Sequence, residues 1–235
     1  MLKLQVNEDS LNTARLCLQE SYLSRISKVS PSTIDITGLF EPERQRVEEF
    51  IKEVYARAYG AKISVNYPVL MSVRDAENNI LAAVGFRYAK DEPLFLEQYT
   101  GKSIDHILQS KRDRIAEIGN LASAGGGASV FLFAALASYL HSKGIEYAAV
   151  TGTDYLHGVF KRMGLEPKEI CEASIRSLQD GGEDWGSYYD TRPRVLVGSV
   201  ADGVARLKKT LGAEYQNIRP RLYPRLHWRT KQCGA

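Results

Sequence analysis

The stretch EIGNLASAGGGAS, residues 117–129, decides the fold of this chain. An apolar run that carries one acid leads into three consecutive glycines, and a nearly all-apolar stretch follows from Val130 to Leu140. The pattern predicts a strand over IAEIGNLA, residues 115–122, and a helix from about Val130 to His141. Three glycines between a strand and a helix remove the side chains where another group approaches the backbone.

The glycine loop after this strand has two interpretations. A helix N-terminus presents unpaired N–H groups and a partial positive charge, and glycines let a phosphate reach them without meeting a Cβ atom. The alternative is a tight turn that packs the helix on the sheet. No Gly-Lys-Ser/Thr follows, so the loop is not a P-loop. As a phosphate cradle it would comprise Ala122, Ser123, Ala124, Gly125, Gly126, Gly127, Ala128 and Ser129.

Further elements are expected on both sides of this unit. Helical spacing predicts an amphipathic helix from about Pro42 to Gly60, and the runs VLMSV (69–73) and ILAAVGF (80–86) predict a hairpin. The remaining expected elements are a short strand within 31–40, strands at 94–99, 145–151 and 194–200, and helices that begin after Ser103 and at Asp154. This order predicts an α/β (α+β) fold with a mixed, mostly antiparallel central sheet flanked by helices.

The length and composition fit one large domain with extensions, since the chain has 235 residues and is 44% hydrophobic. We expect an irregular or helical lead-in over 1–32, a main domain over 33–207 and a basic-aromatic extension over 208–235. Such an extension is typical of a surface for an acidic partner, a phosphate or a peripheral membrane contact, or of a solvated terminal arm. Its basic residues are Arg219, Arg221, Arg225, Arg229 and Lys231.

Several classes of protein are disfavoured by the bulk properties. A net charge of +3 is too small to indicate nucleic-acid binding, and three scattered cysteines without CxxC spacing indicate no metal site. Neither a signal peptide nor an apolar run long enough to cross a membrane is predicted. We therefore expect a cytoplasmic protein with reduced thiols.

The element order from about Glu43 to Pro167 resembles that of the GCN5-related N-acyltransferases. In that fold the central strand splays from its neighbour, and the following loop and helix N-terminus hold the pyrophosphate of acyl-CoA. The typical loop is Gln/Arg-x-x-Gly-x-Gly/Ala, and Ala122 stands where its first residue would be. The chain is also similar to acyl-homoserine-lactone synthases, which take acyl chains from acyl carrier protein. Gly119 and Asn120 replace the Ser-Arg pair of those enzymes.

A second resemblance covers roughly residues 46–207. The segments FIKEVYARAYGAKI, AAVGFR, LFLEQYT, EIGNLAS, FKRMGLEP and WGSYYD together resemble the thermostable hemolysin family of bacteria. The family name records a lytic phenotype and implies no pore mechanism. The acyltransferase-like fold is the better guide to chemistry, although a fold alone does not imply a function.

Acyl transfer to an amine needs a held thioester, a route for the amine proton and donors for the tetrahedral oxyanion. Glu97 and Glu117 lie in apolar runs, where a buried acid is costly unless it is paired. If both runs are neighbouring strands, both acids approach one cleft, as a base or as a site for a cationic amine. Alternatively each acid pairs with a structural arginine, for which Arg87 and Arg114 are available.

Other side chains complete the expected site. Tyr155 lies near the start of the last crossover helix, where the resemblance implies a tyrosine that protonates the leaving thiol. Asn120 is expected as a polar positioner beside the acids, or as a capped or exposed amide. Aromatic groups could wall an acyl tunnel or an acceptor pocket, or pack as a corner. The expected substrate-binding residues are Arg87, Gln98, Tyr99, Trp185, Tyr188 and Tyr189.

The sequence thus predicts an N-acyltransferase-like enzyme that moves a fatty or other acyl group from acyl carrier protein or acyl-CoA to a small amine-bearing acceptor. The amine attacks directly, no cofactor is bound permanently, and the phosphopantetheine-linked donor is a substrate. The basic extension is a predicted docking surface for acyl carrier protein. The alternatives are a membrane-active, haemolytic protein and a non-catalytic binder of an acyl ligand.

Overall fold

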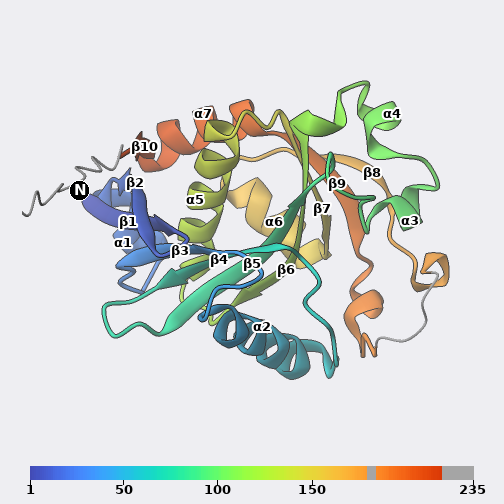
Figure 1. The fold of residues 1–235 in the computed structure, drawn as a ribbon, viewed down its shortest axis with the longest axis horizontal. Helices are drawn as coiled ribbons and strands as arrows, with labels where there is room; N and C mark the ends of the chain where they lie inside the picture. Colours follow the sequence, from blue (N-terminus) through green and yellow to red (C-terminus); the bar gives the residue numbers. More distant parts are fainter. Residues whose placement is uncertain (179–183, 219–235) are drawn as a thin grey trace, which may run out of the picture.

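The computed structural model describes residues 1–178 and 184–218, and its core is a ten-stranded sheet (Figure 1). The strand order is β10-β2-β1-β3-β4-β5-β6-β7-β9-β8. Within the described residues, the pairs β1–β3 and β6–β7 are parallel and the others are antiparallel. The strands are β1 (Leu2–Glu8), β2 (Leu11–Leu18), β3 (Thr33–Thr37), β4 (Val69–Arg74), β5 (Ile80–Tyr88), β6 (Ile115–Ser123), β7 (Tyr147–Gly152), β8 (Lys168–Glu172), β9 (Arg194–Ser199) and β10 (Glu214–Asn217).

Helices cover both faces of this sheet, as the sequence predicts. The helix α2 packs on β4, β5 and β6 from one face, whereas α5 lies on the other face together with α7 (Figure 1). The α5 helix is buried nearly all round because the sheet, α6 and α7 surround it. The helices are α1 (Glu20–Ile26), α2 (Arg44–Tyr59), α3 (Glu97–Thr100), α4 (Ile104–Leu108), α5 (Ala128–Ser142), α6 (Asp154–Arg162) and α7 (Val200–Leu211).

The unit from which the prediction started is confirmed, with the strand at Ile115–Ser123 and the helix at Ala128–Ser142. The β4–β5 hairpin and the α2 helix are confirmed as well. The backbone of Gly60 turns left-handed with φ 67° and ends α2.

The predicted strand at residues 94–99 is wrong. This segment forms turns and the short helix α3. Its first three amides donate to carboxylates instead of to a neighbouring strand: the Leu94 N–H to Glu97, and those of Phe95 and Leu96 to Glu117. Backbone N–H groups that donate to carboxylates are not available to pair with a neighbouring strand, so no sheet forms here.

The irregular or helical lead-in predicted for residues 1–32 is wrong, because this segment contains two strands, β1 and β2. β1 and β2 form a hairpin whose turn residues, Asp9 and Ser10, both have positive φ, and β1 joins the sheet beside β3. At the other end, β10 pairs with β2, and the expected boundary at residue 207 falls inside α7. The basic residues Arg219, Arg221, Arg225, Arg229 and Lys231 lie outside the described residues.

A fork in the sheet positions the site. β6 and β7 pair in parallel only from Ile115 to Ile118 on β6, and beyond that point the two strands part. β6 also carries a bulge: Gly119 faces Gly85 and Ala122 faces Ala83, so two β6 residues stand opposite one β5 residue. Asn120 lies in this bulge with φ 49°.

No helix within the described residues is long and apolar enough to cross a membrane.

Candidate active site

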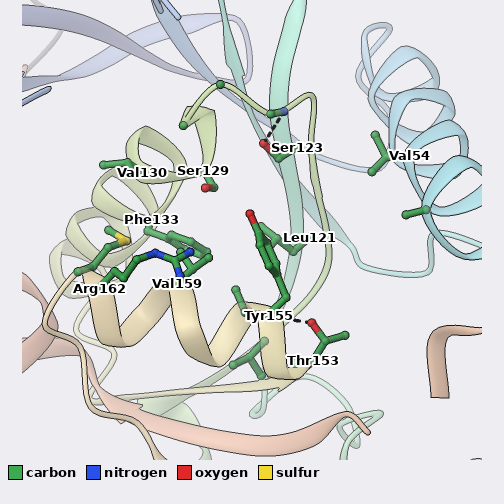
Figure 2. A pocket seen from close by; sticks show the side chains of 18 of the residues that line it. Val54, Leu121, Ser123, Ser129, Val130, Phe133, Thr153, Tyr155, Val159 and Arg162 are labelled. Carbon is green, nitrogen blue, oxygen red and sulfur yellow. Dashed lines mark hydrogen bonds between the residues drawn. The ribbon is translucent and has the colours of Figure 1, made fainter. Parts of the chain in front are cut away.

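The fork opens into a cavity of about 410 Å³, which we call the wide cavity (Figure 2). β6 contributes Gly119, Leu121 and Ser123 to its wall, and β7 contributes residues 150–152. The start of α5, one face of α6, part of α2 and the N-terminal helix α1 complete it. The parting of the two strands therefore creates space that a continuous sheet would lack.

The three glycines of the loop differ in what they face. All have positive φ, at 97°, 62° and 83°. A methyl group at Gly127 would overlap the carbonyl oxygen of Ile26, and one at Gly126 would lie 2.9 Å from a Val29 methyl, whereas Gly125 faces open space. Two of the three glycines thus make room for the chain's own segment after α1, which supports the packing interpretation for them. Gly125 alone faces space that a ligand can enter.

Hydrogen bonds attach the N-terminal segment to the same loop. The Lys28 N–H and the Ser27 hydroxyl both donate to the Gly126 carbonyl oxygen, at 2.8 and 3.1 Å. Within the described part of the chain, the N–H groups of Gly126, Gly127 and Ser129 have no partner. The start of α5 therefore keeps free donors and the positive end of a 15-residue helix at the cavity.

The predicted cradle lines the cavity only in part. Ser123, the three glycines and Ser129 line it. Ala122 is buried in the α2-side core, the Ala124 N–H donates to Leu81, and Ala128 is fully buried. These three alanines hold the loop in place and do not border the cavity.

Tyr155 and Arg162 enter the wide cavity from α6. Figure 2 shows the Tyr155 side chain pointing from the first turn of α6 into the cavity, and this residue is 77% exposed. Arg162 lies at the other end of α6 and is the charged residue among the described ones that line this cavity. Sequence reasoning missed Arg162, because a helical arginine has no distinguishing spacing.

A second, narrow cavity of about 60 Å³ lies on the other side of the fork. It shares Tyr55, Gly119, Thr151 and Tyr188 with the wide cavity, so the two meet where β6 and β7 part. The other residues that line it are Ser64, Asn66, Tyr67, Arg87, Phe95, Tyr99, Asn120 and Trp185.

A third, rear cavity of about 570 Å³ lies between the sheet and the helices α5, α6 and α7. It is mostly apolar, and Leu121, Phe133, Val150 and Leu156 border both it and the wide cavity. The wide cavity is therefore adjacent to an apolar space on one side and to a polar, aromatic space on the other.

Glu117 lies behind the narrow cavity and lines neither it nor the wide cavity. Its carboxylate accepts the N–H groups of Phe95 and Leu96 at 2.9 and 2.8 Å, and the Arg87 Nε lies at 3.4 Å. Burial raises the pKa of Glu117 to about 7, against the opposing effects of Arg87 and the two amides. The acid thus ties the turn at residues 94–96 to β6.

Glu97 is also held by partners. It accepts the N–H groups of Leu94 and Ile104, both at 2.8 Å, and pairs with Arg112 at 2.6 Å. Burial raises its pKa, but the hydrogen bonds from Arg112 and the two amides outweigh burial, so the pKa is lowered overall.

The structure does not bring the two acids into a shared cleft. Each has an arginine partner, which is the alternative that the sequence left open: Arg87 serves Glu117, and Arg112 serves Glu97. Arg114, the second predicted partner, pairs with Glu146 instead.

The aromatic cluster at residues 185–189 packs against α2 and α3. Trp185, Tyr188 and Tyr99 line the narrow cavity, while the Tyr189 hydroxyl lies 2.6 Å from that of Tyr99. Gln98 lies in α3 and lines neither cavity at the fork. The cluster is thus both a packed corner and a wall of the narrow cavity.

Sequence reasoning missed Tyr67, whose ring lies against Gly85 of β5 and Gly119 of β6 at the fork. A methyl group at Gly85 would lie 2.6 Å from the Tyr67 side chain, and one at Gly119 would overlap its hydroxyl. Because Gly85 and Gly119 pair across β5 and β6, the two glycines form one slot for one ring. The pairing of these two glycines can be recognised only from the register of β5 and β6.

Several solved structures share the fold of this chain at low sequence identity. The chain is similar to TofI in a ternary complex with an inhibitor and MTA, with 14% identity over 74% of this chain and 96% of that chain and a TM-score of 0.55. It is similar to FeeM, an N-acyl amino acid synthase from uncultured soil microbes, with 13% identity over 73% of this chain and 98% of that chain and a TM-score of 0.54. It is also similar to BjaI, a CoA-dependent acyl-homoserine lactone synthase with SAM and isopentyl-CoA, with 10% identity over 76% of this chain and 89% of that chain and a TM-score of 0.54.

These similarities confirm the predicted class, a GCN5-related N-acyltransferase-like fold with a mixed, mostly antiparallel sheet. The family model for thermostable hemolysin matches residues 39–204, and the chain belongs to that family. No curated protein sequence matches the chain.

Proposed function

We propose that this protein is an acyltransferase that moves a fatty or other acyl group from acyl-CoA or acyl carrier protein to a small amine. The observation that carries the proposal is the fork between β6 and β7. The wide cavity has free helix amides, the rear cavity is apolar, and the narrow cavity is polar and aromatic. This division suits a phosphate-bearing thioester, its acyl tail and an amine acceptor.

The donor's phosphopantetheine arm and phosphates occupy the wide cavity. The free N–H groups of Gly126, Gly127 and Ser129 at the start of α5 suit a phosphate oxygen. Arg162 adds a charged donor at the same cavity. Gly125 leaves the approach to these groups open, because nothing lies within 4 Å of where its side chain would begin.

The acyl tail passes from the wide cavity into the rear cavity. Leu121, Phe133, Val150 and Leu156 border both spaces and provide an apolar passage. Transfer of a fatty chain from water into such a space is favourable in proportion to the apolar area that it buries. The thioester carbon then lies at the fork, between the donor arm and the acceptor.

The reaction is a direct attack of the amine nitrogen on the thioester carbon. The C–N bond forms, the C–S bond breaks, and the amine gives its proton to water. Asn120 and Leu121 have no register partner in the bulge, and their backbone N–H groups are assigned to stabilise the oxyanion. The leaving thiolate takes a proton from the Tyr155 hydroxyl, which reaches the same cavity, and water returns a proton to the phenolate.

The test combines binding with turnover. A donor at about 100 times its Kd adds about 2.7 kcal/mol of stability, which raises the Tm of a chain this size by roughly 5–10 °C. We expect this shift with long-chain acyl-CoA or acyl carrier protein, and free thiol once an amine is added. A shift without thiol release would identify a non-catalytic binder of the acyl ligand. No shift, together with liposome leakage in the absence of any donor, would favour the membrane-active alternative.

Docking of acyl carrier protein to the basic extension is a separate part of the proposal. Residues 219–235 hold five basic and no acidic side chains, and acyl carrier proteins are acidic. Removing these residues is expected to raise KM for acyl carrier protein and to leave KM for acyl-CoA unchanged. An equal KM for the carrier in both proteins would reject the docking surface.

A further inference from the structure

Several polar side chains at the narrow cavity make no hydrogen bond within the described residues. They include the Tyr67 hydroxyl, the Asn120 amide and the Thr151 hydroxyl, of which the Thr151 oxygen is a buried atom without a partner. Tyr67 is 8% exposed and Asn120 is 9% exposed, so both are more than nine-tenths buried. Buried polar groups without partners destabilise a fold, and native proteins contain few of them. The buried Thr151 hydroxyl, together with the unpaired Tyr67 and Asn120 groups at the same cavity, indicates a polar ligand group.

The fold accommodates these groups at a cost in stability. Gly85 and Gly119 lack side chains in the middle of the sheet, which lets the Tyr67 ring lie against both strands. The Arg87 guanidinium lies 4.5 Å from the centre of that ring and holds it in place. Asn120 has φ 49°, a conformation that a non-glycine residue adopts at a cost.

The volume of the narrow cavity limits what can enter. A cavity of about 150 Å³ holds a benzene molecule, so about 60 Å³ accommodates roughly two or three non-hydrogen atoms. An amino group and the first carbon of its chain fit this space. A second substituent on that carbon does not fit without displacing Tyr67, Tyr55 or Tyr188, which are all buried.

The charges around the cavity favour an uncharged amine. No carboxylate from the described residues lines it. Arg87, the charged group that does line it, pairs with Glu92 and Glu117. Burial raises the pKa of Tyr67 well above 10, so its phenol is a neutral hydroxyl. Three neutral groups with oxygen acceptors match the N–H donors of a free amine.

We propose that the narrow cavity is the acceptor subsite, and that it takes the amino end of a primary amine whose nitrogen is attached to an unbranched CH₂ carbon. Tyr67, Asn120 and Thr151 hydrogen-bond the nitrogen, and the rest of the acceptor extends out of the cavity past Phe95 and Trp185, two half-buried residues of its lining. The inference rests on the proposed acyl transfer, and it excludes amines that are branched next to the nitrogen.

The experiment measures thiol release from long-chain acyl-CoA with matched amines. The pair is n-butylamine and 2-aminobutane, which have the same atoms and differ in branching. We expect kcat/KM to be at least about tenfold higher for the linear amine. Equal values would overturn the subsite while leaving the proposed acyl transfer intact. A donor that produces no thermal shift would instead overturn the proposed function itself.

Two variants test the hydroxyl groups. Tyr67→Phe and Thr151→Val are each expected to raise KM for n-butylamine about fivefold. Tyr67 lines the narrow cavity and not the wide one, so Tyr67→Phe should leave the Kd for acyl-CoA unchanged. Because both hydroxyls lack partners, neither variant should lower Tm, and this separates binding from a structural role. Thr37→Val is the matched control, since the Thr37 hydroxyl is also buried and unpartnered but lies in β3, away from the fork. An unchanged KM in both variants, or the same change in Thr37→Val, would reject the proposal.

Discussion

The two cavities that meet at the fork differ in which atoms make them polar. In the wide cavity the free donors at the start of α5 are backbone amides, and Tyr155 and Arg162 add side-chain groups from α6. In the narrow cavity they are side-chain groups, set among aromatic rings. Backbone donors suit a group that many substrates share, such as a phosphate, whereas side chains suit selection among acceptors.

The glycines at the fork extend this comparison. Gly85 and Gly119 admit Tyr67 on the narrow side, and Gly126 and Gly127 admit the segment after α1 on the wide side. Each pair makes room for the protein's own chain. Gly125 is the exception at the loop, because it faces open space.

The largest expected effect distinguishes the glycines of the loop. Gly127→Ala places a methyl group on the Ile26 carbonyl oxygen in addition to requiring φ 83°, so we expect the free energy of unfolding to fall by about 3 kcal/mol. Gly125→Ala meets no atom and is expected to cost only about 1 kcal/mol, for its positive φ. Urea denaturation measures both.

The same pair tests ligand approach. Gly125→Ala should weaken acyl-CoA binding even though it is the milder substitution for stability. Equal losses of stability in the two variants would show that the contact with Ile26 is not what requires glycine at residue 127.

A second expected effect concerns the acid behind the narrow cavity. Because the pKa of Glu117 rises from 4.5 to about 7 on folding, the folded protein binds its proton more tightly than the unfolded chain does. Its contribution to stability is therefore complete below about pH 4.5 and is lost as the pH rises through about 7. The size is on the order of 3 kcal/mol.

Urea denaturation of the native protein and of Glu117→Gln, at pH 5 and pH 8, isolates this contribution. The native protein should lose more stability than the variant between the two pH values. If both lose the same amount, the carboxyl does not titrate in this range. Thiol release by Glu117→Gln should persist, since the acid lines neither cavity at the fork.

Local pattern was enough to predict some parts of this molecule and insufficient for others. The β6–α5 unit and the β4–β5 hairpin follow from periodicity and turn residues within one stretch of sequence. LFLEQY has the alternation of a strand, but its first three backbone N–H groups donate hydrogen bonds to the carboxylates of Glu97 and Glu117. That competition depends on a residue about twenty positions away, so the local pattern does not contain it.

The candidate site was predictable to a similar degree. The glycine loop and Tyr155 were both predicted and both line the wide cavity, and their roles there stay predictions. Tyr67 was missed because its place depends on the register that sets Gly85 opposite Gly119. The partner of Glu97 was also missed, because α3 and the turn at residues 112–114 bring Arg112, rather than Arg114, to the acid.

The third prediction concerns the group that protonates the leaving thiol on the wide side. Tyr155→Phe should lower kcat about a hundredfold, because the phenol proton is lost while the ring remains. The free energy of unfolding should not change, since the residue is 77% exposed. Tyr147→Phe, in a tyrosine at the start of β7 that lines neither cavity at the fork, is the control. If Tyr155→Phe has the same kcat as the native protein, water and not Tyr155 protonates the leaving thiolate.

The smallest expected effect tests whether the wide cavity recognises phosphate at all. Arg162→Ala removes the charged residue that lines this cavity, and we expect acyl-CoA to bind about tenfold more weakly. An acyl thioester of N-acetylcysteamine has no phosphate, so its binding should be the same in the native and variant proteins. Arg176→Ala, in an exposed turn that lines neither cavity, serves as the control. If both donors weaken equally, Arg162 supports the cavity wall through its aliphatic stem, and phosphate recognition belongs to the α5 amides alone.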